Sequence, residues 1–147
     1  MKKSWLVLFA IVWTGLLMVA GPVRGADWKL CSENEFLSLY FDATRLTRQE
    51  NDAVKVWVKY VPKGKKGREF WAHIRNLDKI PMKRFQHYGS SVVLYELNCN
   101  DKVYRLISGI DYDRENRMLA EMTLSSWKPI YPDSLMETLL PALCRNN

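Results

Sequence analysis

The cysteines at positions 99 and 144 constrain the fold of this 147-residue chain more than any other feature. Strand-forming runs and a leucine-rich helical stretch lie between Cys99 and Cys144 or next to them. A disulfide between the two would close a loop of about 45 residues, worth about 4 kcal/mol by the chain-entropy relation. Such a link needs an oxidising compartment. The third cysteine, Cys31, is then either a buried free thiol or the site of an intermolecular bridge.

The first 25 residues have the layout of a secretory signal. Two lysines follow Met1, residues 5–20 are apolar, and Val23 and Gly25 stand at the small-residue positions of a cleavage site. We expect cleavage after Gly25, with 1–25 as the signal peptide and 26–147 as a single domain. The alternative is an uncleaved membrane anchor, although the apolar run is shorter than the roughly 20 residues of a transmembrane helix.

Removal of the signal changes the charge balance. The whole chain has a formal net charge of +6, to which Lys2, Lys3 and Arg24 contribute, and all 16 acidic residues follow Gly25. The exported domain is therefore only mildly basic, near +3. This charge gives no support to a nucleic-acid partner.

Apolar and aromatic runs predict six β-strands, and the clearest alternates strictly, with Val54, Val56, Val58 and Tyr60 on one face. The predicted strands are 27–30, 37–42, 54–61, 92–99, 103–112 and 118–124. The last three are joined by tight turns at 100–101 and 113–116, which makes them antiparallel neighbours in a meander.

Two helices complete the predicted elements. After a glycine- and lysine-rich loop at 63–68, the spacing of Phe70, Trp71, Ile74 and Leu77 predicts a short amphipathic helix.

Near the C-terminus, Ser134 and Glu137 form a capping box before a leucine-rich stripe, and Pro141 should shorten or kink that helix. The fold class is α+β: an antiparallel sheet of about six strands with a C-terminal helix that a Cys99–Cys144 bridge would fasten to it.

The sequence contains no pattern of residues that is typical of a catalytic or metal site. His73 and His87 belong to no four-ligand pattern. Asp111 and Asp113 begin like a calcium loop, but Asn116 takes the glycine position, so we interpret them as solvated turn residues. We expect no cofactor, no metal and no enzymatic activity.

A basic cluster and three tryptophans are the candidates for binding. The cluster comprises Lys63, Lys65, Lys66 and Arg68, and Arg75, Lys79, Lys83 and Arg84 would extend it. It is either a solubilising loop or an electrostatic handle for acidic glycans, anionic lipid headgroups or an acidic protein. Trp57, Trp71 and Trp127 have the spacing of core residues, whereas an exposed row of them would indicate carbohydrate or protein binding.

Several short motifs resemble the surface-adhesin protein E-like family of bacterial exported proteins over residues 28–144. They are YFD at 40–42, VKVWVK at 54–59, LYELNC at 94–99, YRLIS at 104–108, YD at 112–113, WKPI at 127–130 and PDS at 132–134. The resemblance implies a six-stranded antiparallel sheet and a disulfide between Cys99 and Cys144. It also implies adhesion, since the founding member is an outer-membrane adhesin that binds host matrix and serum proteins and can dimerise. Cys31 has no counterpart, no lipid anchor is evident, and Asn116 replaces a usual turn glycine.

The combined expectation is a non-enzymatic exported binding module of a Gram-negative envelope, in the periplasm or on the outer surface. Its partner is a protein or an acidic polysaccharide, it has no transmembrane span after signal cleavage, and a homodimer is compatible with it. The alternative is a structural envelope protein that self-associates through a sheet edge or Cys31.

Overall fold

The computed structural model describes residues 25–76 and 81–144, which form one eight-stranded antiparallel sheet with short helices. The strands are β1 (Trp28–Glu33), β2 (Leu37–Asp42), β3 (Thr47–Arg48), β4 (Ala53–Pro62), β5 (Tyr88–Asn98), β6 (Val103–Asp113), β7 (Met118–Met122) and β8 (Lys128–Pro129). Their order is β1-β2-β4-β5-β6-β7, while β3 pairs with β4 and β8 with β6. The predicted α+β meander is confirmed, and the two-residue strands β3 and β8 are additions.

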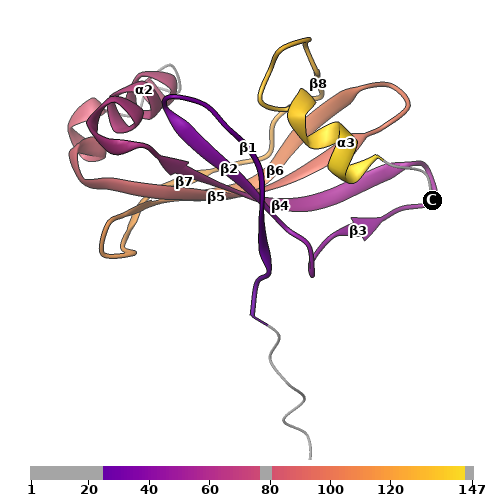
Figure 1. The fold of residues 1–147 in the computed structure, drawn as a ribbon, viewed down its shortest axis with the longest axis horizontal. Coiled ribbons are helices and arrows are strands. Elements are labelled where there is room, and N and C mark those ends of the chain that lie inside the picture. The colour runs from indigo at the N-terminus through magenta and orange to yellow at the C-terminus, as the bar shows by residue number, and fades with distance from the viewer. Residues whose placement is uncertain (1–24, 77–80, 145–147) are drawn as a thin grey trace, which may run out of the picture.

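Both α-helices lie on the same face of the sheet, which is called the inner face (Figure 1). They are α2 (Gly64–Asn76) and α3 (Leu140–Leu143), each next to a 3-10 turn, η1 (Met82–His87) and η2 (Glu137–Leu139). The Tyr60 side chain touches both ends of this layer. Its ring centroid is 4.8 Å from that of Trp71 on α2, and its hydroxyl is 3.8 Å from Met136 Sδ, ahead of η2.

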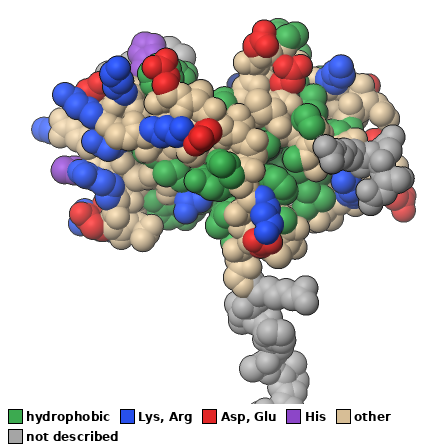
Figure 2. Space-filling view, viewed as in Figure 1, with side chains coloured by type: hydrophobic (Ala, Val, Ile, Leu, Met, Phe, Trp, Pro, Cys, Tyr) green, Lys and Arg blue, Asp and Glu red, His purple; other side chains and the backbone are tan. Residues whose placement is uncertain are grey.

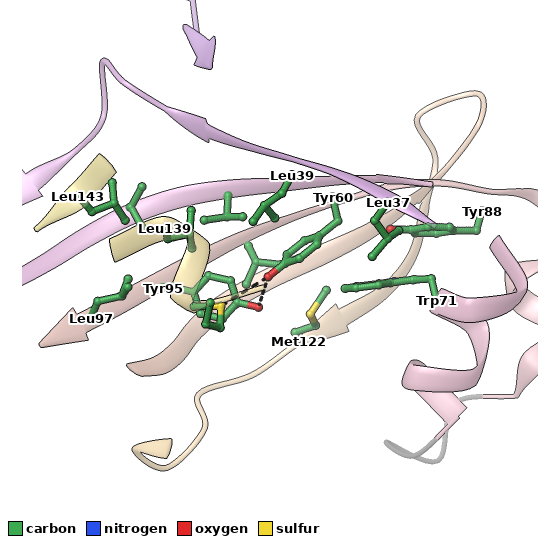
Figure 3. Close-up of a cluster of buried hydrophobic side chains, with 14 of the residues drawn as sticks. Leu37, Leu39, Tyr60, Trp71, Tyr88, Tyr95, Leu97, Met122, Leu139 and Leu143 are labelled. Carbon is green, nitrogen blue, oxygen red and sulfur yellow. Dashed lines mark hydrogen bonds between the residues drawn. The ribbon is translucent and has the colours of Figure 1, made fainter. Parts of the chain in front are cut away.

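The core fills the space between the inner face and the helices (Figure 3). The alternation in β4 buries Val54, Val56, Val58 and Tyr60, as the sequence predicts, because every second side chain of a strand points to the same face. The fully buried Leu139 and Leu143, from the C-terminal segment, cover the part of the core near Tyr95 and Leu97 (Figure 3).

Residues 64–68 of the basic segment are helical and not a loop, and this corrects the sequence-based expectation. The α2 helix already begins at Gly64, whose φ of +60° lets the chain turn out of β4. Gly67 then packs directly on a neighbouring turn, where a Cβ atom would lie 2.1 Å from the Phe36 carbonyl oxygen. Gly64 thus allows the helix to begin, and Gly67 allows it to pack closely on the Phe36 turn.

The buried face of α2 also differs from the predicted stripe. Trp71, Ala72 and Arg75 are buried, whereas Ile74 is 38% exposed. The cause is the seat at Gly67, since residues 67, 71 and 75 share one side of a helix with 3.6 residues per turn. The predicted position Leu77 lies outside the described residues.

The C-terminal segment is linked to the sheet as expected but is less helical. Cys99, just after β5, is bonded to Cys144, the residue that follows α3, with a Cα–Cα distance of 5.6 Å. Pro141 lies in the first turn of α3 and has no amide hydrogen to donate to an earlier turn. The chain before it is therefore the 3-10 turn η2 and not a continuous α-helix. The Glu137 amide donates to Ser134 Oγ at 3.2 Å, which confirms that half of the capping box.

Candidate functional site

A buried polar network fixes α2 on the inner face. Asp111 of β6 is fully buried and accepts hydrogen bonds from Arg75 Nε at 2.9 Å and Trp71 Nε1 at 3.2 Å, both on α2. Ser91 Oγ of β5 donates to the same carboxylate and lies 2.7 Å from the Tyr88 hydroxyl. An isolated buried charge is very costly, so the Arg75–Asp111 ion pair defines where α2 can dock.

The interpretation of Asp111 and Asp113 as solvated turn residues is wrong, because both are buried, at 0% and 4% exposure. A β-bulge explains the error for Asp111. The β5–β6 register shifts between Leu94 and Tyr95, so Ile107 has no partner and the alternation in β6 reverses. Beyond the bulge, the odd-numbered positions of β6 point inward.

Asp113 organises the β6–β7 turn. Its carboxylate accepts from the backbone amides of Glu115 at 2.9 Å and Arg117 at 2.8 Å, and from Arg117 Nε at 2.7 Å. Burial opposes ionisation, but these donors together hold the pKa of Asp113 below its ordinary value. Asn116 has a φ of +61°, so it takes the conformation in which a glycine is usual.

A groove of about 540 Å³ separates α2 from η1 and is the candidate functional site. Phe85, at 1% exposure, forms its apolar floor. Charged side chains surround this floor, and Figure 2 shows Lys and Arg side chains gathered at the α2 end of the molecule. The lining residues are Lys65, Arg68, Glu69, Ala72, Lys83, Phe85 and Gln86.

The helix divides the predicted basic cluster between two sides. Lys65 and Arg68 line the groove, as expected for residues one turn apart. Lys63 instead pairs with Glu33 at the end of β1, with Nζ and Oε2 2.9 Å apart, and this contact lowers the pKa of Glu33. Lys66 is exposed and does not line the groove.

Of the four residues expected to extend the basic cluster, the structure places one, Lys83, beside Lys65 and Arg68. Lys83 is exposed and lines the groove from η1. Arg75 is buried against Asp111 and adds nothing to the surface charge. Lys79 and the side chain of Arg84 lie outside the described part of the chain.

The charges at the start of α2 oppose the helix dipole. The first turn of α2 contains no acidic residue, yet Lys65 and Lys66 lie in it and Lys63 precedes it. Lysines at the positive end of a helix are unfavourable, each by about 0.3–1 kcal/mol. Glu69 offsets part of this cost through an ion pair with Lys65, with Nζ and Oε1 3.6 Å apart. The groove therefore combines side-chain cations with a helix end of the same sign.

The three tryptophans occupy different environments. Trp71 is a core residue, as its spacing predicts. Trp57 is half-buried on the outer face of the sheet, the face opposite the helices. Trp127 is 44% exposed, and the Arg105 guanidinium carbon lies 4.7 Å from its ring centroid. Two of the three therefore belong to the surface.

Cys31 is a free thiol in the edge strand β1. Its Sγ donates to the Thr138 carbonyl oxygen at 3.1 Å, and burial raises the pKa of the thiol. Beside it, Leu30 is 54% exposed in a shallow hollow of about 380 Å³ that Phe41 and Pro141 also line.

The fold and these surfaces define a class of protein, a small disulfide-linked α+β domain with several grooves on its surface. Within the described ranges, no three His, Cys, Asp or Glu side chains are grouped so that they could hold a metal ion. The family model described as surface-adhesin protein E matches residues 28–145, and the chain belongs to this family. No curated protein and no solved structure matches the chain.

Family membership confirms the resemblance found in the sequence motifs, and it also indicates the general role of the chain. The chain is an adhesin-like surface protein, and adhesins are exported and bind a partner. Among residues 25–76 and 81–144, no helix is long and apolar enough to cross a membrane.

Proposed function

We propose that this chain is a non-enzymatic exported binding module and that it holds an acidic partner in the groove between α2 and η1. The observation that carries the proposal is the convergence of Lys65, Arg68 and Lys83 on an apolar floor at Phe85. The cations attract carboxylate or sulfate groups. An acidic polysaccharide or an acidic protein segment has this chemistry.

Salt dependence is the first test of an electrostatic site. The Debye length falls from about 30 Å at 0.01 M salt to about 8 Å at 0.15 M, so affinity for a polyanion should fall steeply between these conditions. Immobilised heparin and polyglutamate serve as the two probes, one a polysaccharide and the other a polypeptide. Retention of either probe that does not change with salt would contradict the proposed site.

Matched variants test the position of the site. The triple variant Lys65→Ser, Lys83→Ser and Arg68→Ser removes three charges from the groove. The control Lys29→Ser, Arg48→Ser and Lys128→Ser removes three exposed charges elsewhere. We expect the groove variant to lose retention and the control to keep most of it. Equal losses would show that only net charge matters, and the groove would then not be the site.

A second candidate function is self-association, with a homodimer as its simplest form. It is favoured by the exposed edge of β1, where the apolar side chain of Leu30 is 54% exposed next to Cys31. Because burial disfavours the Cys31 thiolate, this contact would be non-covalent. Sedimentation of the wild type and of Leu30→Lys tests it: a dimer that the variant abolishes supports it, and a monomeric wild type refutes it.

Export is the third part of the proposal. We propose that residues 1–25 are a cleaved signal and that the domain 26–147 acts in the periplasm or on the outer surface of a Gram-negative envelope. The Cys99–Cys144 disulfide supports this, because such bonds persist in oxidising compartments. Mass spectrometry of the exported protein should find Ala26 as its first residue, whereas an intact Met1 would contradict cleavage.

A further inference from the structure

The outer face of the sheet carries a second, independent group of surface side chains. Both α-helices lie on the inner face, and the strand alternation sends Trp57 of β4 and Ile110 and Tyr112 of β6 to the other side. Glu121 of β7 is the cross-strand partner of Ile110, so it shares that face. These side chains come from three strands, and strand β5 lies between β4 and β6, with Val92 as the cross-strand partner of Ile110.

A network of hydrogen bonds around the buried carboxylate of Asp42 positions an arginine, Arg45, at the edge of this group. Asp42 is fully buried and accepts from the Asp27 amide at 3.2 Å and from Thr44 N and Oγ1 at 3.0 and 2.7 Å. It also accepts from Arg45 Nε, so one N–H of the guanidinium is held by the protein.

Two indole rings complete the positioning of Arg45. Its guanidinium carbon lies 5.5 Å from the ring centroid of Trp57 and 6.0 Å from that of Trp28. Among the described residues, no acceptor is found for its two terminal nitrogens, and the side chain is 49% exposed. A fixed guanidinium with free terminal N–H groups is suited to bind a carboxylate through two hydrogen bonds.

A hollow of about 370 Å³ opens next to this arginine. Its lining includes Arg45, Trp57, Ser108, Ile110, Tyr112 and Glu121. The volume is near the lower end of the roughly 300–1,000 Å³ of small-molecule sites, and the mixture of aromatic surface with a few polar groups is typical of them. Ser108 and Glu121 are exposed and offer a hydroxyl and a carboxylate.

The charges of the hollow are separated. Arg45 lies at one end with Lys59 near it, since Lys59 Nζ is 5.8 Å from the Trp28 ring centroid. Glu121 is the acidic group in the lining and comes from the edge strand β7. A ligand anionic along its whole length would be repelled by Glu121. A ligand with a carboxylate at one end and hydroxyl groups at the other matches both ends.

We propose that this hollow binds a sugar acid, such as a uronic or sialic acid residue of an acidic glycan. Arg45 receives the carboxylate, Trp57 and Ile110 face the apolar C–H groups of the sugar ring, and Glu121 and Ser108 hydrogen-bond the hydroxyl groups. This site lies on the face of the sheet opposite α2. It does not depend on the basic groove, and either site can fail without the other.

The test is a titration of the isotope-labelled protein with D-glucuronate and N-acetylneuraminate, followed by NMR at the Trp57 indole N–H. Glucose and acetate are the matched probes, because the first lacks the carboxylate and the second lacks the ring. We expect saturable binding of the sugar acids at about millimolar concentration, and at least about tenfold weaker binding of glucose and acetate. Acetate binding as tight as glucuronate binding, or no saturation with either sugar acid, would overturn the proposal.

Variants separate the site from general effects on the fold. Glu121→Gln changes an exposed side chain and should weaken glucuronate binding about tenfold. Arg45→Gln should reduce glucuronate binding to the level of glucose. The groove variant Lys65→Ser, Arg68→Ser and Lys83→Ser should leave the titration unchanged. Unaltered binding in Glu121→Gln, or a loss in the groove variant, would overturn the proposal, as would displacement of glucuronate by short neutral peptides.

Discussion

Replacement of Asp111 by asparagine should detach α2 from the sheet more effectively than any change on the surface of that helix. The wild-type carboxylate neutralises the buried guanidinium of Arg75, whose side chain is 8% exposed, at an Nε–Oδ2 distance of 2.9 Å. Asparagine retains an acceptor for Trp71 but removes the negative charge. The buried cation of Arg75 then loses its ion pair with residue 111.

The magnitude follows from the burial of the pair. Removal of one partner of a buried ion pair costs about 3–5 kcal/mol, and we expect about 3 kcal/mol for Asp111→Asn because two hydrogen bonds to the amide can survive. Arg75→Met should cost a similar amount. Because the same contact is lost in both, the double variant should cost about 1–2 kcal/mol less than the sum of the single variants.

Urea denaturation of the four proteins in this double-mutant cycle measures the free energy of unfolding. The surface pair Lys29–Asp27 is the control, since its side chains are 56% and 46% exposed and its atoms are 3.1 Å apart. Lys29→Met should cost less than about 1 kcal/mol. Additive losses in the Asp111 cycle, or a single-variant cost as small as the control, would refute the network as the anchor of α2.

Three further predictions concern the disulfide, the helix start and a buried carboxylate. Cys99→Ser should lower the free energy of unfolding by about 4 kcal/mol, and adding Cys144→Ser should cost little more, in thermal melts without reductant; an unchanged melting midpoint would exclude the bond. Replacing Lys65 and Lys66 by serine should raise stability by about 0.3–1 kcal/mol per residue, because cations at the N-terminus of α2 oppose its dipole; a clear loss in urea titrations would show that they stabilise the helix. For Asp42, burial raises the pKa, but hydrogen bonds from Thr44 and Arg45 outweigh it and set the pKa to about 2. A lowered pKa stabilises the fold above the unfolded value near 3.8, so about 2 kcal/mol should be lost as the pH falls through about 2. The variant Asp42→Asn should lack this part of the acid transition, and an identical pH profile would contradict the assignment.

The strands and the disulfide were predictable because their signals are local or covalent. Strict alternation around Val56 and turn chemistry at Asn116 act within a few residues, and both are found as expected. The phase of β6 was not predictable, since one unpaired residue at Ile107 reverses every later side chain.

The start of α2 was hidden for a different reason. The two glycines at positions 64 and 67 have poor helix propensity, and the three lysines around them repel one another, so local preference indicates a loop. Tertiary contacts decide otherwise, through Gly67 on the Phe36 carbonyl and Arg75 on Asp111. Phe36 and Asp111 are both far from α2 in the sequence. The basic residues of the groove could therefore be predicted, but the helix that arranges them could not.

The way in which α2 docks on the sheet has a consequence for which of its side chains can be exchanged. Gly67, Trp71 and Arg75 hold the helix on one side, and each is tied to a particular atom of the sheet layer. The side chains at 65, 68 and 69 project into the groove from a different side and share none of those atoms. The residues that anchor α2 are therefore different from those that line the proposed binding groove, so substitutions in the groove can change its chemistry while the helix docks in the same way.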